Sequence, residues 1–199
     1  MKKIVLTLSI FLLFLSSVSA KETVKYVVCI DGDTFKVFID NEIKTIRLLA
    51  VDTPETAKSD KEADYYADEA SEYTCKRIKQ AKKIVLEYDS NSDKHDKYDR
   101  VLAWVFLDGD LLQSDLVENG YAKVAYLYND YKYTDMLIKK QELASAKNIG
   151  VWNSNAKTKY ENKETTKINE LDEKYSNIEV IIITILLLIF VIISKKKIK

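Results

Sequence analysis

Histidine, glycine and cysteine are scarce in this chain of 199 residues, and each scarcity argues against one class of site. His95 is the only histidine and lies in a polar stretch, which disfavours a Ser-His-Asp triad and a histidine-rich metal centre. Four glycines leave little material for a glycine-rich phosphate loop, and the two cysteines lack metal-ligand spacing. Chemistry based on carboxylates and arginines remains.

The two cysteines can be either paired or free. Cys29 ends an apolar stretch, and Cys75 lies in a predicted helix. An exported protein could join them in a disulfide. Free buried cysteines are common, however, so we expect two free thiols.

Charged residues gather at one end of a predicted hairpin. Residues 35–39 and 43–51 have the pattern of two strands, and a turn at 40–42 joins them. At a rise of about 3.3 Å per residue, side chains just outside the strands meet at the open end. These are Asp33, Asp52 and Glu55, with Arg47 in the second strand. Carboxylates bind hard cations and arginines bind phosphate, so the set predicts a metal-dependent phosphodiester site.

Arg47 interrupts an otherwise apolar strand, so its guanidinium needs an anionic partner. One candidate is a neighbouring carboxylate, which is the simpler structural interpretation. The other is a ligand phosphate, gripped by two parallel hydrogen bonds. The strand pattern alone leaves both open.

Four short runs, in this order, resemble the secreted thermonucleases, the staphylococcal nuclease-like family. They are 30–34 (IDGDT), 47–56 (RLLAVDTPET), 96–104 (DKYDRVLAW) and 122–128 (AKVAYLY). The resemblance covers residues 25 to 152. It implies a Ca²⁺-dependent endo- and exonuclease that hydrolyses single-stranded or unwound DNA and RNA to 3′-phosphorylated products.

The resemblance also implies a role for individual residues. The implied Ca²⁺ ligands are Asp33, Asp52 and the backbone carbonyl of Thr53. Glu55 would orient or deprotonate the attacking water, and Arg47 and Arg100 would bind the phosphate. The positions implied to contact the nucleotide are Lys97, Tyr98, Tyr126 and Tyr128.

Asp99 departs from the family pattern, which often has glycine just before the second arginine. A turn residue with positive φ explains glycine there, and aspartate is among the residues that tolerate that conformation. Its negative charge beside Arg100 could weaken phosphate binding. We expect a modified rate rather than lost function.

The strand and helix patterns predict one mixed α and β domain. Strands are predicted at 24–30, 35–39, 43–51, 84–89 and 101–107, and helices at 62–80, 111–119 and 134–147. Asp110 is the predicted cap of the second helix. The family resemblance implies a more specific α+β fold, a five-stranded OB-fold-type β-barrel with about three α-helices.

Both ends of the chain have targeting patterns. Residues 1–20 are typical of a cleaved signal peptide, although an uncleaved anchor is the alternative. The catalytic domain is expected at 21–155, and the polar segment 156–177 is expected to be a solvated stalk. Residues 178–194 resemble a transmembrane anchor rather than a buried core helix, and 195–199 form a basic cytoplasmic tail. We therefore expect an exported, monomeric protein anchored to the cell-surface membrane, with its catalytic domain extracellular.

Two other functions compete with a nuclease: an inactive nucleic-acid-binding OB-fold module tethered to the membrane, and a tethered domain that binds a protein partner. Both predict loss of the acidic and arginine positions, which are all present. Residues 21–155 hold 20 basic and 25 acidic residues, a net charge of −5, so nucleic-acid binding must depend on a cation and local arginines. The sequence does not distinguish DNA from RNA as the preferred substrate or Mg²⁺ from Ca²⁺ as the cation, and it does not indicate the physiological role.

Overall fold

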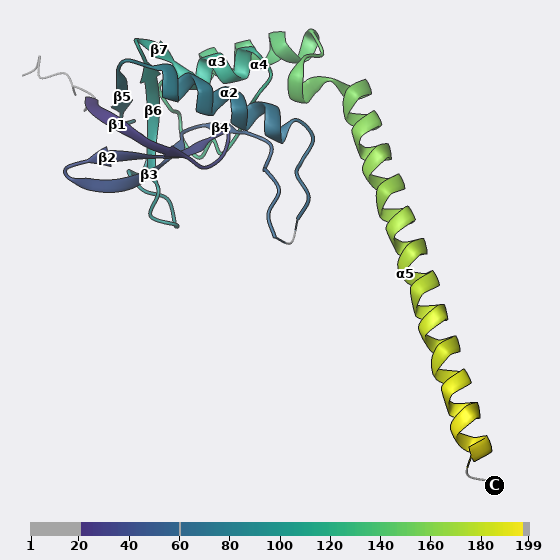
Figure 1. Cartoon of the computed structure of the whole chain (residues 1–199). Coiled ribbons are helices and arrows are strands. Elements are labelled where there is room, and N and C mark those ends of the chain that lie inside the picture. Colours follow the sequence, from purple (N-terminus) through teal and green to yellow (C-terminus); the bar gives the residue numbers. More distant parts are fainter. Residues whose placement is uncertain (1–20, 60, 197–199) are drawn as a thin grey trace, which may run out of the picture. The chain divides into compact units, whose positions relative to one another are not determined.

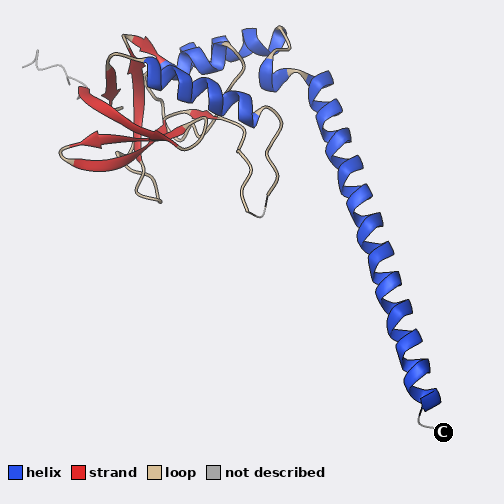
Figure 2. Ribbon diagram, viewed as in Figure 1, coloured by secondary structure: helices blue, strands red, loops and turns tan. Residues whose placement is uncertain are grey.

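The computed structural model describes residues 21–59 and 61–196, in two units that divide between Asn153 and Ser154. The predicted signal peptide, residues 1–20, lies outside the described residues, as do residues 197–199 of the predicted tail. The first unit has the α+β fold that the family resemblance implies (Figures 1 and 2).

A closed barrel of five strands forms the centre of the first unit. Its strands are β1 (Lys21–Cys29), β2 (Thr34–Ile39), β3 (Glu42–Leu48), β5 (Ile84–Glu87) and β6 (Val101–Leu107). Neighbours pair antiparallel in the order β3-β2-β1-β5-β6, and a parallel pairing of β3 with β6 closes the barrel. Closure leaves no free sheet edge among these strands, as in an OB-fold.

Strand β1 contributes to both sides of the barrel because it bends. Residues 21–24 pair with β5, residues 25–29 pair with β2, and the register shifts between Tyr26 and Val28. Alternate residues of the strands point inward, so Phe35, Val37 and Trp104 are completely buried in the core. Asp40 and Asn41 have positive φ in the turn between β2 and β3, which confirms the predicted hairpin.

Three helices cover the barrel close to their predicted positions: α2 (Ala67–Gln80), α3 (Leu112–Glu118) and α4 (Thr134–Ala146). Helix α2 begins five residues later than predicted, because Tyr66 has a left-handed backbone. The predicted cap at Asp110 is wrong, since this residue belongs to the short strand β7 (Asp110–Leu111), which pairs with β6. Two further short strands, β4 (Val51–Asp52) and β8 (Lys123–Val124), pair with each other beside the barrel.

The second unit is one helix, α5 (Ser154–Lys196), preceded by the 3-10 turn η1 (Gly150–Trp152) of the first unit. The segment 156–177, which is predicted to be a solvated stalk, is helical, with mostly exposed side chains. It contains neither glycine nor proline, so nothing in it interrupts a helix. No helix among the described residues is long and apolar enough to cross a membrane. Many side chains of the predicted anchor, 178–194, lie outside the described set.

Glu87, on β5, is the charged group buried most completely in the barrel. Its carboxylate forms ion pairs with Lys21, at 3.0 Å, and with Lys132. The Tyr133 hydroxyl lies 3.2 Å from the same carboxylate. Burial alone would raise the pKa of Glu87, but the hydrogen bonds from the two lysines outweigh it and hold the pKa below 4.5.

We predict that Glu87→Gln lowers the free energy of unfolding by about 1–3 kcal/mol at pH 7. Because the folded-state pKa is depressed, this contribution is complete above the unfolded pKa and disappears as the pH falls through the folded pKa. Urea denaturation of both proteins between pH 7 and pH 3 measures it. The wild-type and variant curves should converge at the acid end, and a constant difference would contradict the assignment.

Candidate active site

The hairpin places Asp33 beside Arg47 at its open end. In the register of β2 and β3, Thr34 lies opposite Arg47, and the Leu48 N–H donates to the Asp33 carbonyl at 2.9 Å. This is the arrangement that the sequence predicts for the two residues.

Arg47 is only 7% exposed, and four oxygens surround its guanidinium. Its Nη1 donates to the carbonyls of Leu48 at 2.9 Å and Val51 at 2.7 Å. Its Nη2 lies 3.1 Å from Asp33 Oδ2 and 3.0 Å from Asp52 Oδ1. The neighbouring carboxylates are therefore the anionic partners of Arg47 in this structure, and the two carbonyls fix its orientation.

Asp52 reaches the cluster through the pairing of β4 with β8, in which it lies opposite Lys123. The same pairing brings in Tyr126, whose ring centroid lies 5.5 Å from the Arg47 guanidinium carbon. The Tyr126 hydroxyl shares a hydrogen bond with Asp52, and the charge of that carboxylate raises the pKa of the phenol. Tyr126 therefore stays a protonated donor at neutral pH.

Thr53 connects the carboxylates to the turn before β2. Its N–H donates to Asp33 Oδ2 at 3.1 Å. Its hydroxyl is buried and has no hydrogen-bond partner among the described residues. A Cβ on Gly32 would lie 2.6 Å from that hydroxyl, so only glycine permits this approach.

The cluster contains more negative than positive charge. Burial, reinforced by the charges of Asp33 and Glu55, raises the pKa of Asp31. Burial and the charge of Asp33 likewise raise the pKa of Asp52, although Arg47 opposes this effect. Raised carboxylate pKa values indicate that a further cation would be stabilised here.

The donor atoms fit a hard divalent cation. Carboxylate oxygens and a backbone carbonyl are the ligands that Ca²⁺ and Mg²⁺ prefer. Among the described residues, no group of three or more His, Cys, Asp or Glu side chains is arranged to hold a metal ion. A cation bound by Asp33 and Asp52 would therefore need oxygens other than side-chain carboxylates, such as the Thr53 carbonyl and water.

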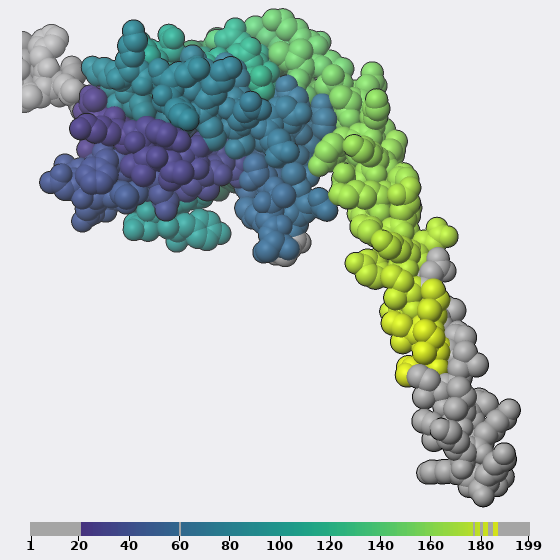
Figure 3. All heavy atoms as spheres, viewed as in Figure 1, coloured from purple at the N-terminus to yellow at the C-terminus, as the bar shows by residue number. Residues whose placement is uncertain are grey.

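Glu55 lies on the long segment between β4 and α2, which projects from the domain (Figures 1 and 3). Its side chain is 44% exposed and pairs with Lys58 at 2.5 Å. Asp64 holds the base of this segment, because its carboxylate accepts from the Glu55 N–H at 3.1 Å and its own N–H donates to the Glu55 carbonyl at 2.9 Å. Glu55 is close enough to influence the pKa values of Asp31 and Asp52.

Arg100 is a predicted catalytic residue whose contacts, among the described residues, lie outside this cluster. It binds Asp96, with Nε and Nη2 each 2.7 Å from Oδ2. It immediately precedes β6, whose Val101 pairs with Ile46 of β3, so its backbone lies beside the strand of Arg47. Asp99 has φ of 60°, which confirms the expected positive φ at this turn.

The other predicted substrate contacts lie on exposed loops. Tyr98 is 67% exposed and Tyr128 is 78% exposed. Lys97 Nζ lies 4.9 Å from the Tyr98 ring centroid, and the Tyr126 and Tyr128 rings are 6.5 Å apart. Tyr98 also lies 5.3 Å from the Arg100 guanidinium carbon. The structure thus places aromatic and basic groups together on two loops.

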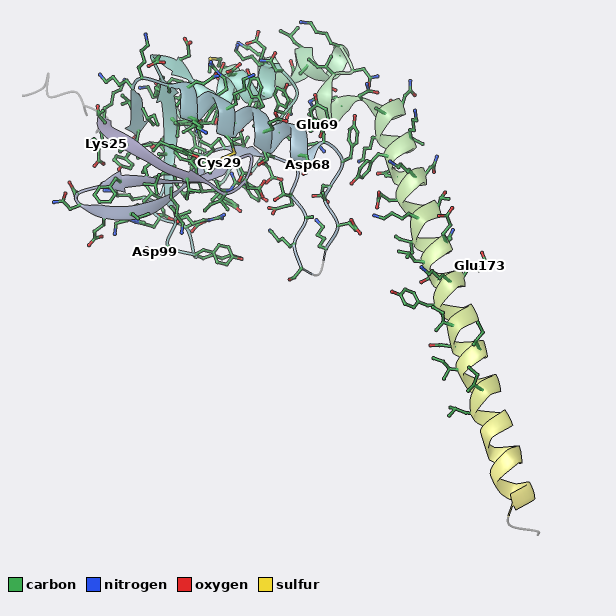
Figure 4. The ribbon with its side chains drawn as sticks, viewed as in Figure 1. Lys25, Cys29, Asp68, Glu69, Asp99 and Glu173 are labelled. Atoms are coloured by element: carbon green, nitrogen blue, oxygen red, sulfur yellow. A yellow bond between two sulfur atoms is a disulfide. The ribbon has the colours of Figure 1, made fainter. Side chains whose placement is uncertain are left out.

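Thr74, which no sequence pattern singles out, and Cys75 tie α2 to the site. Thr74 donates its hydroxyl to the Gly32 carbonyl at 2.7 Å. Cys29 and Cys75 form a disulfide, so the expectation of two free thiols is wrong (Figure 4). The pairing bridges strand and helix, and neither cysteine has a spacing that reveals the other.

We predict that replacing both cysteines, Cys29→Ser with Cys75→Ser, lowers the free energy of unfolding by about 2–4 kcal/mol. The bridge joins residues 46 positions apart and so restricts the unfolded chain. Guanidinium denaturation without reductant measures the difference. A reductant should destabilise the wild-type protein equally and leave the double variant unchanged; an unshifted midpoint in the variant would contradict a stabilising bridge.

Comparison with known proteins assigns these residues to a family. The model of the family described as staphylococcal nuclease homologue matches residues 45–154.

The SPbeta prophage-derived endonuclease YokF of Bacillus subtilis (strain 168) is 38% identical over 127 residues, which cover 63% of this chain and 42% of that protein. Endonuclease YncB of the same organism is 39% identical over 124 residues, covering 62% and 58%. A thermonuclease of Staphylococcus hyicus is 34% identical over 134 residues, covering 67% and 78%. The match thus spans about half the length of the two Bacillus relatives.

Proposed function

Because this chain belongs to the staphylococcal nuclease homologue family, we propose that it is a Ca²⁺-dependent nuclease that hydrolyses the phosphodiester bonds of DNA and RNA. The observation that carries the proposal is the cluster of Asp33 and Asp52 around the buried guanidinium of Arg47. Relatives named endonuclease and thermonuclease support the same reaction class.

In this proposal Asp33, Asp52 and the Thr53 carbonyl hold the cation. When bound, Ca²⁺ would act as a Lewis acid on the phosphate and neutralise part of its charge. Asp33 is oriented for this role by the Thr53 N–H, and the Thr34 hydroxyl donates to its other oxygen at 2.9 Å. Fixed second-layer hydrogen bonds of this kind keep a ligand in position.

Glu55 is the proposed general base. Its carboxylate would accept a proton from the attacking water as the new P–O bond forms and the bond to the 5′ oxygen breaks, which leaves a 3′-phosphate. Lys58 forms an ion pair with this carboxylate in the structure, but both side chains are about half exposed. An exposed ion pair is weak, so substrate can displace the lysine at little cost.

The two arginines are proposed to stabilise charge on the phosphate in the transition state. The carbonyls of Leu48 and Val51 fix the orientation of the Arg47 guanidinium, and its four contacts use Nη1 and Nη2, which leaves the Nε–H to donate to a phosphate. Arg100 is held by Asp96, whose pKa is lowered because hydrogen bonds from Arg100 and nearby N–H groups outweigh its burial. The exposed groups proposed to bind the nucleotide are Lys97, Tyr98, Tyr126 and Tyr128.

We predict that the purified chain cleaves single-stranded DNA with Ca²⁺ and that a chelator stops it. Glu55→Gln should lower kcat by about 10²–10⁴, because the amide cannot accept the proton. Glu62→Gln, on the same projecting segment, is the matched control and should keep wild-type turnover. Turnover by Glu55→Gln within threefold of wild type, still stopped by chelator, would remove Glu55 as the base. Chelator-resistant cleavage would remove the metal.

We also propose that the protein is held at the outer face of the cell membrane. This rests on the sequence alone, on the apolar run 178–194 and the lysines after it. Protease added to intact cells is expected to release active nuclease by cutting within 156–177, the exposed part of α5. Full protection of the chain from external protease would contradict the proposal.

A further inference from the structure

We propose that a row of four tyrosines in ring contact, three of them stacked, forms a second base-stacking platform, on which the nucleic acid continues beyond the cleaved phosphate. This inference rests on the proposed nuclease function. The four residues, called the tyrosine row below, are Tyr65, Tyr66, Tyr121 and Tyr73. None of them belongs to the set proposed above for substrate binding.

The rings form a continuous series. Tyr73 and Tyr121 stack with centroids 4.1 Å apart and an interplanar angle of 18°. Tyr121 stacks on Tyr66 at 5.6 Å and 20°, and Tyr66 meets Tyr65 at 5.6 Å and 39°. A nucleobase can extend such a stack, because every base has a flat π-face.

The inner end of the tyrosine row is rigid. Tyr73 and Tyr121 pack against the hydrophobic core. The Tyr73 hydroxyl donates to Asp115 Oδ1 at 2.9 Å, and Arg77 Nε holds the other oxygen of that carboxylate at 2.8 Å. A platform fixed before substrate arrives binds a base with little loss of conformational freedom.

Both ends of the tyrosine row are tied to the candidate active site. Tyr65 directly follows Asp64, which forms two backbone hydrogen bonds with Glu55. Tyr73 directly precedes Thr74, which binds the Gly32 carbonyl next to Asp33. In the proposal, a strand whose phosphate lies at the carboxylates continues along these two attachments to the tyrosine row.

The backbone of Tyr66 supports a role beyond packing. Its φ is 71°, a conformation that bulky residues rarely adopt. It also occupies the cap position of α2 without a side-chain hydrogen bond, where Ser, Asp or Asn would stabilise the helix. Tyr66 thus takes the place of a hydrogen-bonding cap residue, and its left-handed backbone holds an aromatic ring in the tyrosine row.

Nearby charges indicate that the tyrosine row contacts bases rather than phosphates. Asp68 and Glu69 lie in the first turn of α2 (Figure 4), and the charge of Glu69 adds to burial in raising the pKa of Tyr65. Carboxylates repel a phosphate backbone but not a neutral base. Binding at the tyrosine row should therefore depend little on salt.

The test compares two substrates in Tyr65→Ala, the variant that removes the outermost ring. One substrate is a 12-nucleotide single-stranded DNA, and the other is a mononucleotide 4-nitrophenyl phosphodiester, too short to reach the tyrosine row. We expect KM for the 12-mer to rise about tenfold with kcat unchanged, and the same ratio at 50 and 200 mM salt. Both constants for the small ester should stay at wild-type values.

Two matched variants complete the experiment. Tyr65→Phe keeps the ring and should restore wild-type KM. Phe38→Ala removes an exposed ring at the far end of the β2–β3 hairpin and should have no effect. An unchanged KM for the 12-mer in Tyr65→Ala overturns the inference, and so does an equal loss on both substrates, which would mean that Tyr65 only positions Glu55.

Failure of the proposed nuclease function can be told apart from failure of this inference. If the wild-type protein cleaves neither substrate, the nuclease proposal fails. Fluorescence anisotropy with a labelled 12-mer then still measures binding. A tenfold weaker Kd for Tyr65→Ala than for wild type supports the platform, and equal Kd values overturn it.

Discussion

The buried guanidinium of Arg47 is the interaction on which the candidate site depends. It holds the carboxylates of Asp33 and Asp52 close together, although burial and the charge of Asp33 raise the pKa of Asp52. Without a buried cation, two carboxylates at this depth would be driven apart or protonated. Arg47 also anchors the turn after β3 through the carbonyls of Leu48 and Val51. One side chain therefore links the end of the barrel hairpin to the segment that supplies the acidic residues.

Helix α2 gives this cluster its second support. Two consecutive helix residues make the attachment: Cys75 forms a disulfide with Cys29 at the end of β1, and Thr74 donates to the Gly32 carbonyl in the short loop between β1 and β2. That loop carries Asp31 and Asp33. Since a loop alone adopts many conformations, covalent and hydrogen-bonded attachment to a helix reduces the entropy lost when the carboxylates are held in place.

Local patterns predicted much of this arrangement, and long-range contacts escaped prediction. The hairpin is readable because strand periodicity and a turn at Asp40 and Asn41 are local, and they fix Asp33 beside Arg47. The barrel closure between β3 and β6, by contrast, pairs segments about 55 residues apart and leaves no local signal. The family resemblance supplied it. The hydrogen bond of Thr74 was missed for the same reason, and the Cys29–Cys75 disulfide was the alternative that the sequence did not favour.

The charge of the domain also bears on how it could hold a polyanion. A net charge of −5 over residues 21–155 gives no general attraction to nucleic acid, so binding must come from local features. Arginines and a cation would attract one phosphate, but Asp68 and Glu69 in the first turn of α2 would repel phosphates that flank it on the side of the tyrosine row. Stacking on tyrosine avoids this repulsion, because it acts on the neutral bases. In the proposed function, an acidic nuclease would have more need of aromatic platforms than a basic one, and the aromatic rings on exposed loops and beside α2 would meet that need.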